Sequence, residues 1–117
     1  MLPGIEQCLY FRLTLVSRQV SIVSVIKSFR CDLTERIFRD ELVRKFPLDF
    51  QRTARRKLIA IDRAQDLNDL RVPPGNHLER LRGDRAGQYS IRINAQWRIC
   101  FRWDADGAKD VEIVDYH

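Results

Sequence analysis

The fold is decided by residues 88–103, which read QYSIRINAQWRICFRW. Apolar residues recur at every second position on both sides of residues 94–96, as expected for two β-strands with one buried face each. A three-residue loop pairs Ile93 with Trp97 and keeps both faces of the hairpin uniform. A two-residue loop would instead set Ile93 across from Arg98 and mix apolar with charged side chains. The sequence therefore predicts an antiparallel hairpin with a three-residue loop.

This register has an electrostatic consequence on the outer face of the hairpin, because it places Arg92 directly opposite Arg98. Like charges across a strand pair are destabilising. We therefore expect an anionic ligand between the two arginines. The alternative is that Glu79 or Glu112 neutralises them from a neighbouring strand.

The residues that precede the hairpin predict one strand and one short helix. Residues 22–30 are rich in β-branched and aromatic side chains, which favours a strand. Asp32 and Thr34 are both suitable N-caps for a helix that ends near Pro47. We expect these two elements to pack with the hairpin.

A second and longer helix is predicted to begin at the N-cap Asp49. Leu67 and Leu70 extend its apolar pattern as far as the Pro73-Pro-Gly stop. One stripe of this helix is apolar and contains Phe50, Ala54, Leu58 and Ile61. The other side is basic and contains Arg52, Arg55, Arg56, Lys57 and Arg63. This amphipathic pattern predicts an apolar face against the core and a basic outer face.

The end of the chain predicts a further hairpin. Asp104-Ala-Asp-Gly107 is a turn signal, and residues 111–116 follow as a strand. Alternation separates Val111 from Glu112, but the sequence does not decide which of the two faces the core. The complete pattern predicts an α+β fold, in which an antiparallel sheet of three to four strands carries two helices on one face.

Charge is distributed unevenly along this chain of 117 residues with a formal net charge of +5. Residues 79–102 contain six arginines and two acidic residues, whereas residues 103–117 contain five acidic residues and one lysine. A cluster of arginines is typical of a protein that binds an anionic polymer such as a nucleic acid. The alternative is a solvated basic face that the acidic tail offsets.

Composition also argues against several classes of protein. The three cysteines show no paired spacing, which indicates free thiols in a reducing cytoplasm. With only His77 and His117 available, we expect no metal site. No nucleotide fingerprint is present, so we expect no cofactor. Charged residues interrupt the apolar runs near the N-terminus, and we expect no membrane association.

The chain ends in Tyr116 and His117. Histidine is the side chain whose ordinary pKa lies near neutrality, so it suits acid–base catalysis. An acid–base group that follows a cluster of arginines favours chemistry on phosphate groups.

Two stretches carry a resemblance to a known family: PPGNHLERLRGDRAGQYSIRINAQWRICF over residues 73–101 and VEIVDYH over residues 111–117. Together with VIKSF over residues 25–29, they resemble the HigB toxins of the RelE-like superfamily. The resemblance covers residues 25–117 as a single domain. Residues 1–24 lie outside it, either as a genuine extension or as translated upstream sequence, and we favour the second interpretation.

The resemblance implies a RelE-like fold and a bacterial toxin that inhibits translation. Such a toxin is an endoribonuclease that cleaves mRNA in the ribosomal A site, and the composition leads us to expect chemistry without a metal. The implied partners are the ribosome, mRNA and a HigA-type antitoxin, with operator DNA contacted only through the antitoxin.

Roles follow from the residues that match the family motif. Arg98 is the implied arginine that stabilises the transition-state phosphate, and Tyr116 with His117 is the implied terminal catalytic pair. The chain departs from the family pattern at Glu79, where many members have His, and at Gln96, where some have Asn. Which group acts as the base therefore stays open between His117 and Glu79.

The candidate catalytic residues are Glu79, Gln96, Arg98, Tyr116 and His117, and the candidate substrate-binding residues are Arg82, Arg85, Arg92 and Arg102. Arg82 stands where the family pattern often has Lys. A competing hypothesis is a nucleic-acid-binding module of a toxin–antitoxin complex that has no catalytic activity. A third hypothesis is a structural partner protein that neither binds RNA nor arrests growth.

Overall fold

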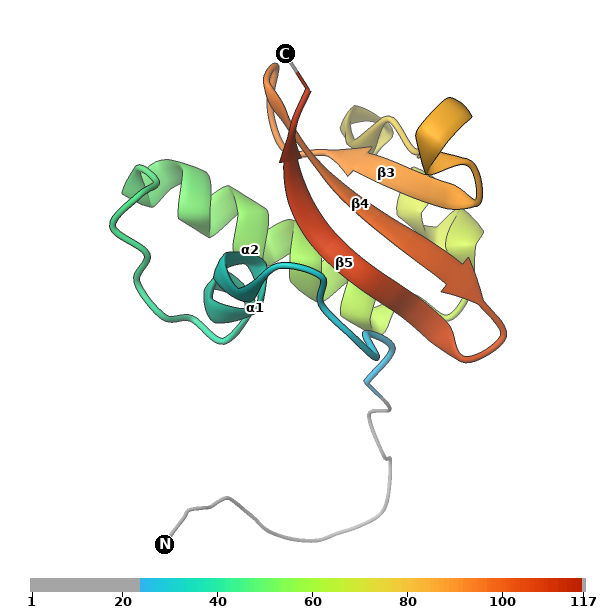
Figure 1. Cartoon of the computed structure of the whole chain (residues 1–117), viewed down its shortest axis with the longest axis horizontal. Coiled ribbons are helices and arrows are strands. Elements are labelled where there is room, and N and C mark those ends of the chain that lie inside the picture. Colours follow the sequence, from blue (N-terminus) through green and yellow to red (C-terminus); the bar gives the residue numbers. More distant parts are fainter. Residues whose placement is uncertain (1–23, 117) are drawn as a thin grey trace, which may run out of the picture.

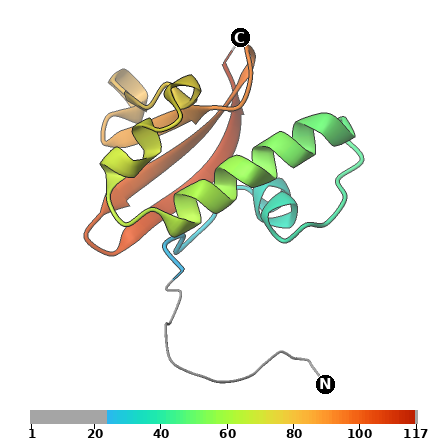
Figure 2. The ribbon, with the colours of Figure 1, turned by 180° about the vertical axis from the view of Figure 1, so that it is seen from behind.

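The computed structural model describes residues 24–116 and shows helices on one face of an antiparallel sheet (Figures 1 and 2). The helices are α1 (Asp32–Phe38) and α2 (Leu48–Arg63), followed by the short 3-10 helices η1 (Leu67–Arg71), η2 (Pro74–Asn76) and η3 (Gly83–Arg85). The sheet has the strand order β2 (Glu79–Arg80), β3 (Gln88–Arg92), β4 (Trp97–Asp104) and β5 (Gly107–Asp115). The predicted α+β architecture is confirmed.

The central hairpin has the predicted register. Ile91 pairs with Ile99 and Arg92 pairs with Arg98. The backbone N–H of Ile93 donates to the carbonyl of Trp97 at 2.9 Å, which closes the three-residue loop. The free energy gained by keeping apolar and polar side chains on separate faces therefore outweighs the repulsion between the two facing arginines and sets this register.

The apolar core lies between α2 and the sheet. The α2 residues Ala54, Leu58 and Ile61 are fully buried, and so are Ile99 and Val111 from the sheet. The burial of Val111 answers the question that the sequence left open, because it places Glu112 and Val114 on the face away from the helices. The predicted apolar stripe of α2 is confirmed.

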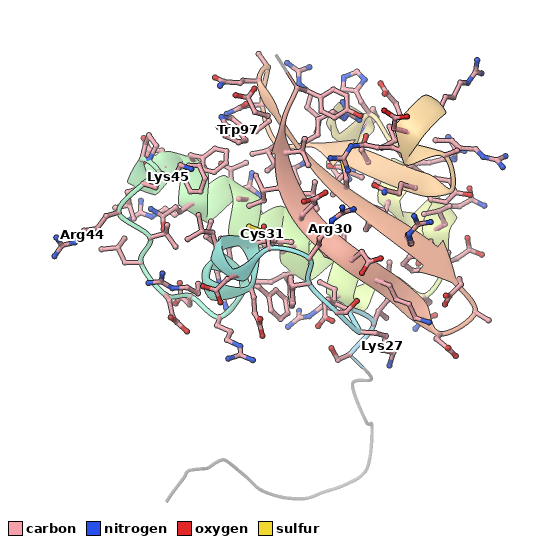
Figure 3. The ribbon with its side chains drawn as sticks, in the orientation of Figure 1. Lys27, Arg30, Cys31, Arg44, Lys45 and Trp97 are labelled. Carbon is pink, nitrogen blue, oxygen red and sulfur yellow. The ribbon has the colours of Figure 1, made fainter. Side chains whose placement is uncertain are left out.

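Trp97 belongs to an aromatic cluster at the end of the sheet where α2 begins. Its ring centroid lies 5.4 Å from that of Phe46 and 5.5 Å from that of Phe50. Trp97 and Lys45 line the same small cavity, on the side of the molecule where Figure 3 labels them. Packing on two phenyl rings is consistent with a core role for this tryptophan.

The strand predicted over residues 22–30 is wrong for the residues that the structure describes. Residues 24–30 form only two isolated parallel bridges to β5, Ile26 with Ala108 and Phe29 with Val111, and residues 22 and 23 lie outside the described part. The carboxylate of Asp62 accepts hydrogen bonds from the backbone N–H groups of Val25 and Ile26. Between the two bridges, the Ser28 hydroxyl and not a backbone carbonyl accepts the N–H of Asp110, so the pairing with β5 is interrupted there.

The predicted boundaries of the first helix are also wrong. The N-cap position of α1 is Cys31, and the Thr34 hydroxyl instead accepts a hydrogen bond from the backbone N–H of Ile113 at 3.0 Å. The helix ends at Phe38, well before Pro47, and Asp40 follows with a positive φ of 65°. Because left-handed backbone cannot continue an α-helix, the chain leaves the helical path there.

The second helix begins and ends earlier than predicted. Its N-cap is Pro47 and not Asp49, and it ends at Arg63. Leu67 and Leu70 belong to η1, which begins with a capping box between Asp66 and Asp69. Among the helices of residues 24–116, none is long and apolar enough to cross a membrane.

Gly107 provides a test of how residues 24–30 dock on β5. Its φ is +130°, and an added Cβ would lie 2.3 Å from the carbonyl oxygen of Val25. Gly107→Ala should therefore lower the free energy of unfolding by about 2 kcal/mol or more, measured by urea denaturation. Gly75→Ala is the matched control, since nothing lies within 4 Å of its added Cβ. Equal losses in the two variants would contradict this account of the docking.

Candidate active site

The face of the sheet opposite the helices carries a polar row that crosses all four strands. Glu79 pairs with Ser90, Ser90 with Cys100, and Cys100 with Glu112. Ser90 and Cys100 have no exposed surface although they lie on this outer face. We call this surface the polar face. Because Ser90 and Cys100 are buried there, larger polar side chains must cover them, and the positions of these larger side chains define the site.

Arg98 covers the centre of the polar face with a guanidinium that is itself buried, at 8% exposure for the residue. Its Nε donates to the Ser90 hydroxyl at 2.7 Å, and its Nη2 donates to the carbonyl oxygen of His77. The remaining nitrogen, Nη1, lies 3.9 Å from the carboxylate of Glu79. That separation is an ion-pair distance but is too long for a hydrogen bond. Arg98 is thus fixed on one side and directs Nη1 toward the exposed side.

Tyr116 lies beside this guanidinium at the end of β5. Its backbone N–H donates to the carbonyl of Gln96 at 2.7 Å, and the Arg98 Cζ is 5.7 Å from the centre of its ring. Burial raises the pKa of the Tyr116 hydroxyl, and nearby Cys100 acts in the same direction, whereas Arg98 opposes them. The phenol is therefore neutral near pH 7 and suits donation of a hydrogen bond.

A second ion pair lies on the polar face beside Cys100. Nη1 of Arg85 donates to Glu112 at 2.9 Å and to the side-chain oxygen of Gln88 at 3.1 Å. The hydrogen bond with Glu112 raises the pKa of Arg85 above its ordinary value. Burial raises the pKa of the Cys100 thiol, which keeps it protonated and unsuited to nucleophilic attack.

The structure brings three of the candidate catalytic residues together: Arg98, Glu79 and Tyr116. Gln96 contributes to the site through its backbone, while its side-chain amide donates to Asp115 at 3.0 Å. His117 lies outside the described residues. Glu79 lies at ion-pair distance from Arg98, as in the alternative in which a carboxylate neutralises the facing arginines.

The candidate substrate-binding arginines are more dispersed. Arg92 lies opposite Arg98, and its Nε donates to the backbone of the loop that follows. Arg82 is exposed at the start of η3. Arg102 forms an ion pair with Asp110 and is four residues from Arg98 along β4, roughly 13 Å away. Arg85 is paired with a carboxylate, as described above.

No cluster of three or more His, Cys, Asp or Glu side chains that could hold a metal ion occurs within residues 24–116. The chemistry of the site as described comes from a guanidinium, a carboxylate and a phenol. These groups suit the stabilisation of a phosphate and the transfer of a proton.

Comparison with known proteins assigns the chain to a family. Residues 27–117 match the model of the RelE-like toxin of type II toxin–antitoxin systems, HigB. The chain belongs to this family of HigB-like toxins. It is 41% identical to Toxin HigB-1 of Vibrio cholerae over 78 residues, which is 67% of this chain and 81% of that protein.

Two further similarities support the assignment. Endoribonuclease HigB of Proteus vulgaris is 31% identical over 93 residues, which is 80% of this chain and the whole of that protein. A solved YoeB-YefM complex from Staphylococcus aureus contains a chain that is 20% identical, with a TM-score of 0.52 over 79% of this chain and 97% of that chain. This HigB-like toxin therefore has the same fold as that solved chain.

Sequence reasoning missed the Ser90 hydroxyl and the His77 carbonyl, which hold Arg98 in this HigB-like toxin. It named Glu112 only as a neutraliser of the facing arginines, and extending the hairpin register to the last strand could have placed Glu112 in one row with Ser90 and Cys100. An irregularity between Cys100 and Arg102 shifts that register, so simple alternation fails there. The carbonyl of His77 gave no signal, because any residue carries one.

The raised pKa of Tyr116 can be tested by spectrophotometric titration. The difference between the wild-type protein and Tyr116→Phe should show a phenol that ionises above the ordinary pH of about 10. An acid with a raised pKa stays protonated at lower pH, so no tyrosinate from this residue should appear near neutrality. A difference curve with an ordinary or lowered midpoint would contradict the partial desolvation of this hydroxyl, which belongs to a residue that is 43% exposed.

Proposed function

We propose that this HigB-like toxin is an endoribonuclease that cleaves mRNA in the ribosomal A site and thereby inhibits translation. The observation that carries the proposal is the geometry at Arg98, whose guanidinium is fixed by Ser90 and His77 and directs one nitrogen toward Glu79. A fixed cation can stabilise the charge of a reacting phosphate without reorganising during the reaction. The name of the relative from Proteus vulgaris, an endoribonuclease, agrees with this role.

The proposed reaction needs no metal. A base removes the proton of a ribose 2′-OH, the oxygen attacks the adjacent phosphorus, and an acid protonates the departing 5′-oxygen. His117 and Glu79 are the candidates for these two proton transfers. Arg98 stabilises the pentavalent phosphate, with Arg92 and Arg82 in support. The neutral Tyr116 hydroxyl orients the substrate or donates a hydrogen bond to it.

The proposed partners follow from the family. The toxin domain, residues 25–117, acts in the cytoplasm on ribosome-bound message and is inhibited by a HigA-type antitoxin, which alone contacts operator DNA. The ribosome has a physical role in this scheme, because a few arginines and acid–base groups cleave poorly until another surface holds the RNA in line. Cleavage of naked RNA should accordingly be weak.

Arg98→Lys tests the role of the guanidinium. Lysine keeps the charge but loses the fork that reaches Ser90 and His77 while also facing the substrate. We expect kcat for ribosome-dependent cleavage to fall by about 10²–10³. The measurement is single-turnover cleavage of a short message on purified ribosomes. Metal dependence is measured separately, on the weak cleavage of naked RNA with EDTA present, because ribosomes need Mg²⁺ to stay assembled.

Arg71→Lys is the matched control, since Arg71 is an exposed arginine in η1 that contacts Asn68. Its cleavage rate should stay within about twofold of the wild-type rate. Wild-type kcat in Arg98→Lys would refute the role of Arg98. Loss of the weak cleavage of naked RNA on addition of EDTA would refute the metal-free reaction.

The question of the base can be resolved with two variants, Glu79→Gln and His117→Ala. Each should lower kcat, because each removes a proton-transfer group. The base must be deprotonated to act, so its removal should abolish the acidic limb of the pH–rate profile, whereas removal of the acid should abolish the alkaline limb. A variant that keeps both limbs and the wild-type rate is not one of the two groups.

The basic side of α2 supports a second candidate function, a nucleic-acid-binding module without catalysis. Arg52, Arg56 and Arg63 are exposed there. Expression should then arrest growth even when His117→Ala and Arg98→Lys are combined. Charge reversal of the three α2 arginines to Glu, followed through a salt series on ribosome binding, separates this function from the catalytic one.

A further inference from the structure

One partner of Arg98 comes from outside the sheet and raises the question of what holds it. The Arg98 Nη2 donates to the carbonyl of His77, which follows η2. His77 has a φ of +44°, and its own N–H donates to the carbonyl of Pro74 at 3.1 Å. The direction of this carbonyl is therefore set by the tight turn of residues 74–77. The position of the guanidinium depends in turn on where that turn lies.

Asn76 fixes the turn from inside the molecule. It is a polar residue at 1% exposure, and its Nδ2 donates to the carbonyls of Leu70 at 3.1 Å and Val72 at 3.3 Å. Its Oδ1 accepts a hydrogen bond from Nζ of Lys57 on α2. A buried amide with both ends bonded has one orientation, so it connects η1, η2 and α2 rigidly.

Lys57 differs from the other basic residues of α2. Its ammonium points to Asn76, whereas Arg52, Arg56 and Arg63 are exposed. Burial lowers the pKa of Lys57, and the adjacent Arg56 acts in the same direction. The Lys57 ammonium loses hydration where it bonds Asn76, and this loss costs free energy. Its placement therefore favours a positioning role over that of a solvated surface charge.

We propose that Lys57 and Asn76 are positioning residues for catalysis, which act on Arg98 through the carbonyl of His77. The Lys57–Asn76 bond fixes the turn against α2, and the turn presents the carbonyl that holds Nη2. Neither residue touches substrate in this scheme. The proposal rests on the proposed function, because it assigns Arg98 the transition-state contact.

The test uses Lys57→Met, which keeps the length of the side chain and removes its donor. We expect kcat for ribosome-dependent cleavage to fall at least about tenfold with KM nearly unchanged, since small misplacements of a catalytic group are costly. Lys57→Arg should restore most of the rate because it restores a donor. Lys109→Met is the control: it removes a lysine paired with Asp104 at an exposed turn, and its rate should match wild type.

Two further measurements separate positioning from general loss of stability. In an Arg98→Ala background, Lys57→Met should cause no additional loss of kcat, because its effect passes through the missing group. The ¹H–¹⁵N signal of the Arg98 Nε should exchange with solvent at least about tenfold faster in Lys57→Met than in wild type. Circular dichroism and thermal unfolding check that the variants are folded.

The outcomes distinguish the two proposals. Wild-type kcat and an unchanged Nε signal in Lys57→Met would overturn the positioning role, and so would a full additional loss in the Arg98→Ala background. If the wild-type protein does not cleave ribosome-bound message at all, the proposed function fails. The Nε signal still decides in that case whether Lys57 fixes Arg98.

Discussion

A buried guanidinium that donates through Nε and Nη2 to fixed acceptors is the constraint on which the rest of the site depends. Arg98 cannot lie at the centre of the polar face unless acceptors replace the water that it loses. The acceptors come from two sources, the hydroxyl of Ser90 on β3 and the carbonyl of His77 in the turn after η2. The sheet and the turn must therefore adopt their native relation before Arg98 can be buried. In this way folding and the preparation of the site are coupled.

Much of the sheet could be predicted because its signal is local and repeated. The alternation on both sides of residues 94–96 fixes the hairpin register, and a slip of one residue would bury Arg98 among apolar groups and expose Ile99. The apolar stripe of α2 is equally periodic, which is why Ala54 and Leu58 were placed in the core correctly. An element whose apolar residues recur with one regular period can therefore be predicted from the sequence.

The parts that could not be predicted depend on single, nonlocal hydrogen bonds. Between its two bridges to β5, a segment with strand composition offers the Ser28 hydroxyl to the backbone N–H of Asp110, which lies far along the chain. Thr34 resembles an N-cap in the sequence, yet its hydroxyl serves β5 instead. The partner of Arg98 at residue 77 is a backbone carbonyl, which no sequence pattern marks. Composition gives the propensity of a segment but not the competitor that overrides it.

The contact of Glu79 with Arg98 explains how the arginine can have a carboxylate partner before substrate binds and still be available to a phosphate in the proposed reaction. The Glu79 side chain is 55% exposed and lies 3.9 Å from Nη1, so screening by water limits this pair to about 1 kcal/mol or less. A phosphate can accept shorter, charge-assisted hydrogen bonds from the same guanidinium and should displace the carboxylate. Under the proposed mechanism the displaced Glu79 then lies beside the nucleotide as a free acceptor. An ion pair that is weak at rest would thus become a cation for the phosphate and a candidate base for the 2′-OH.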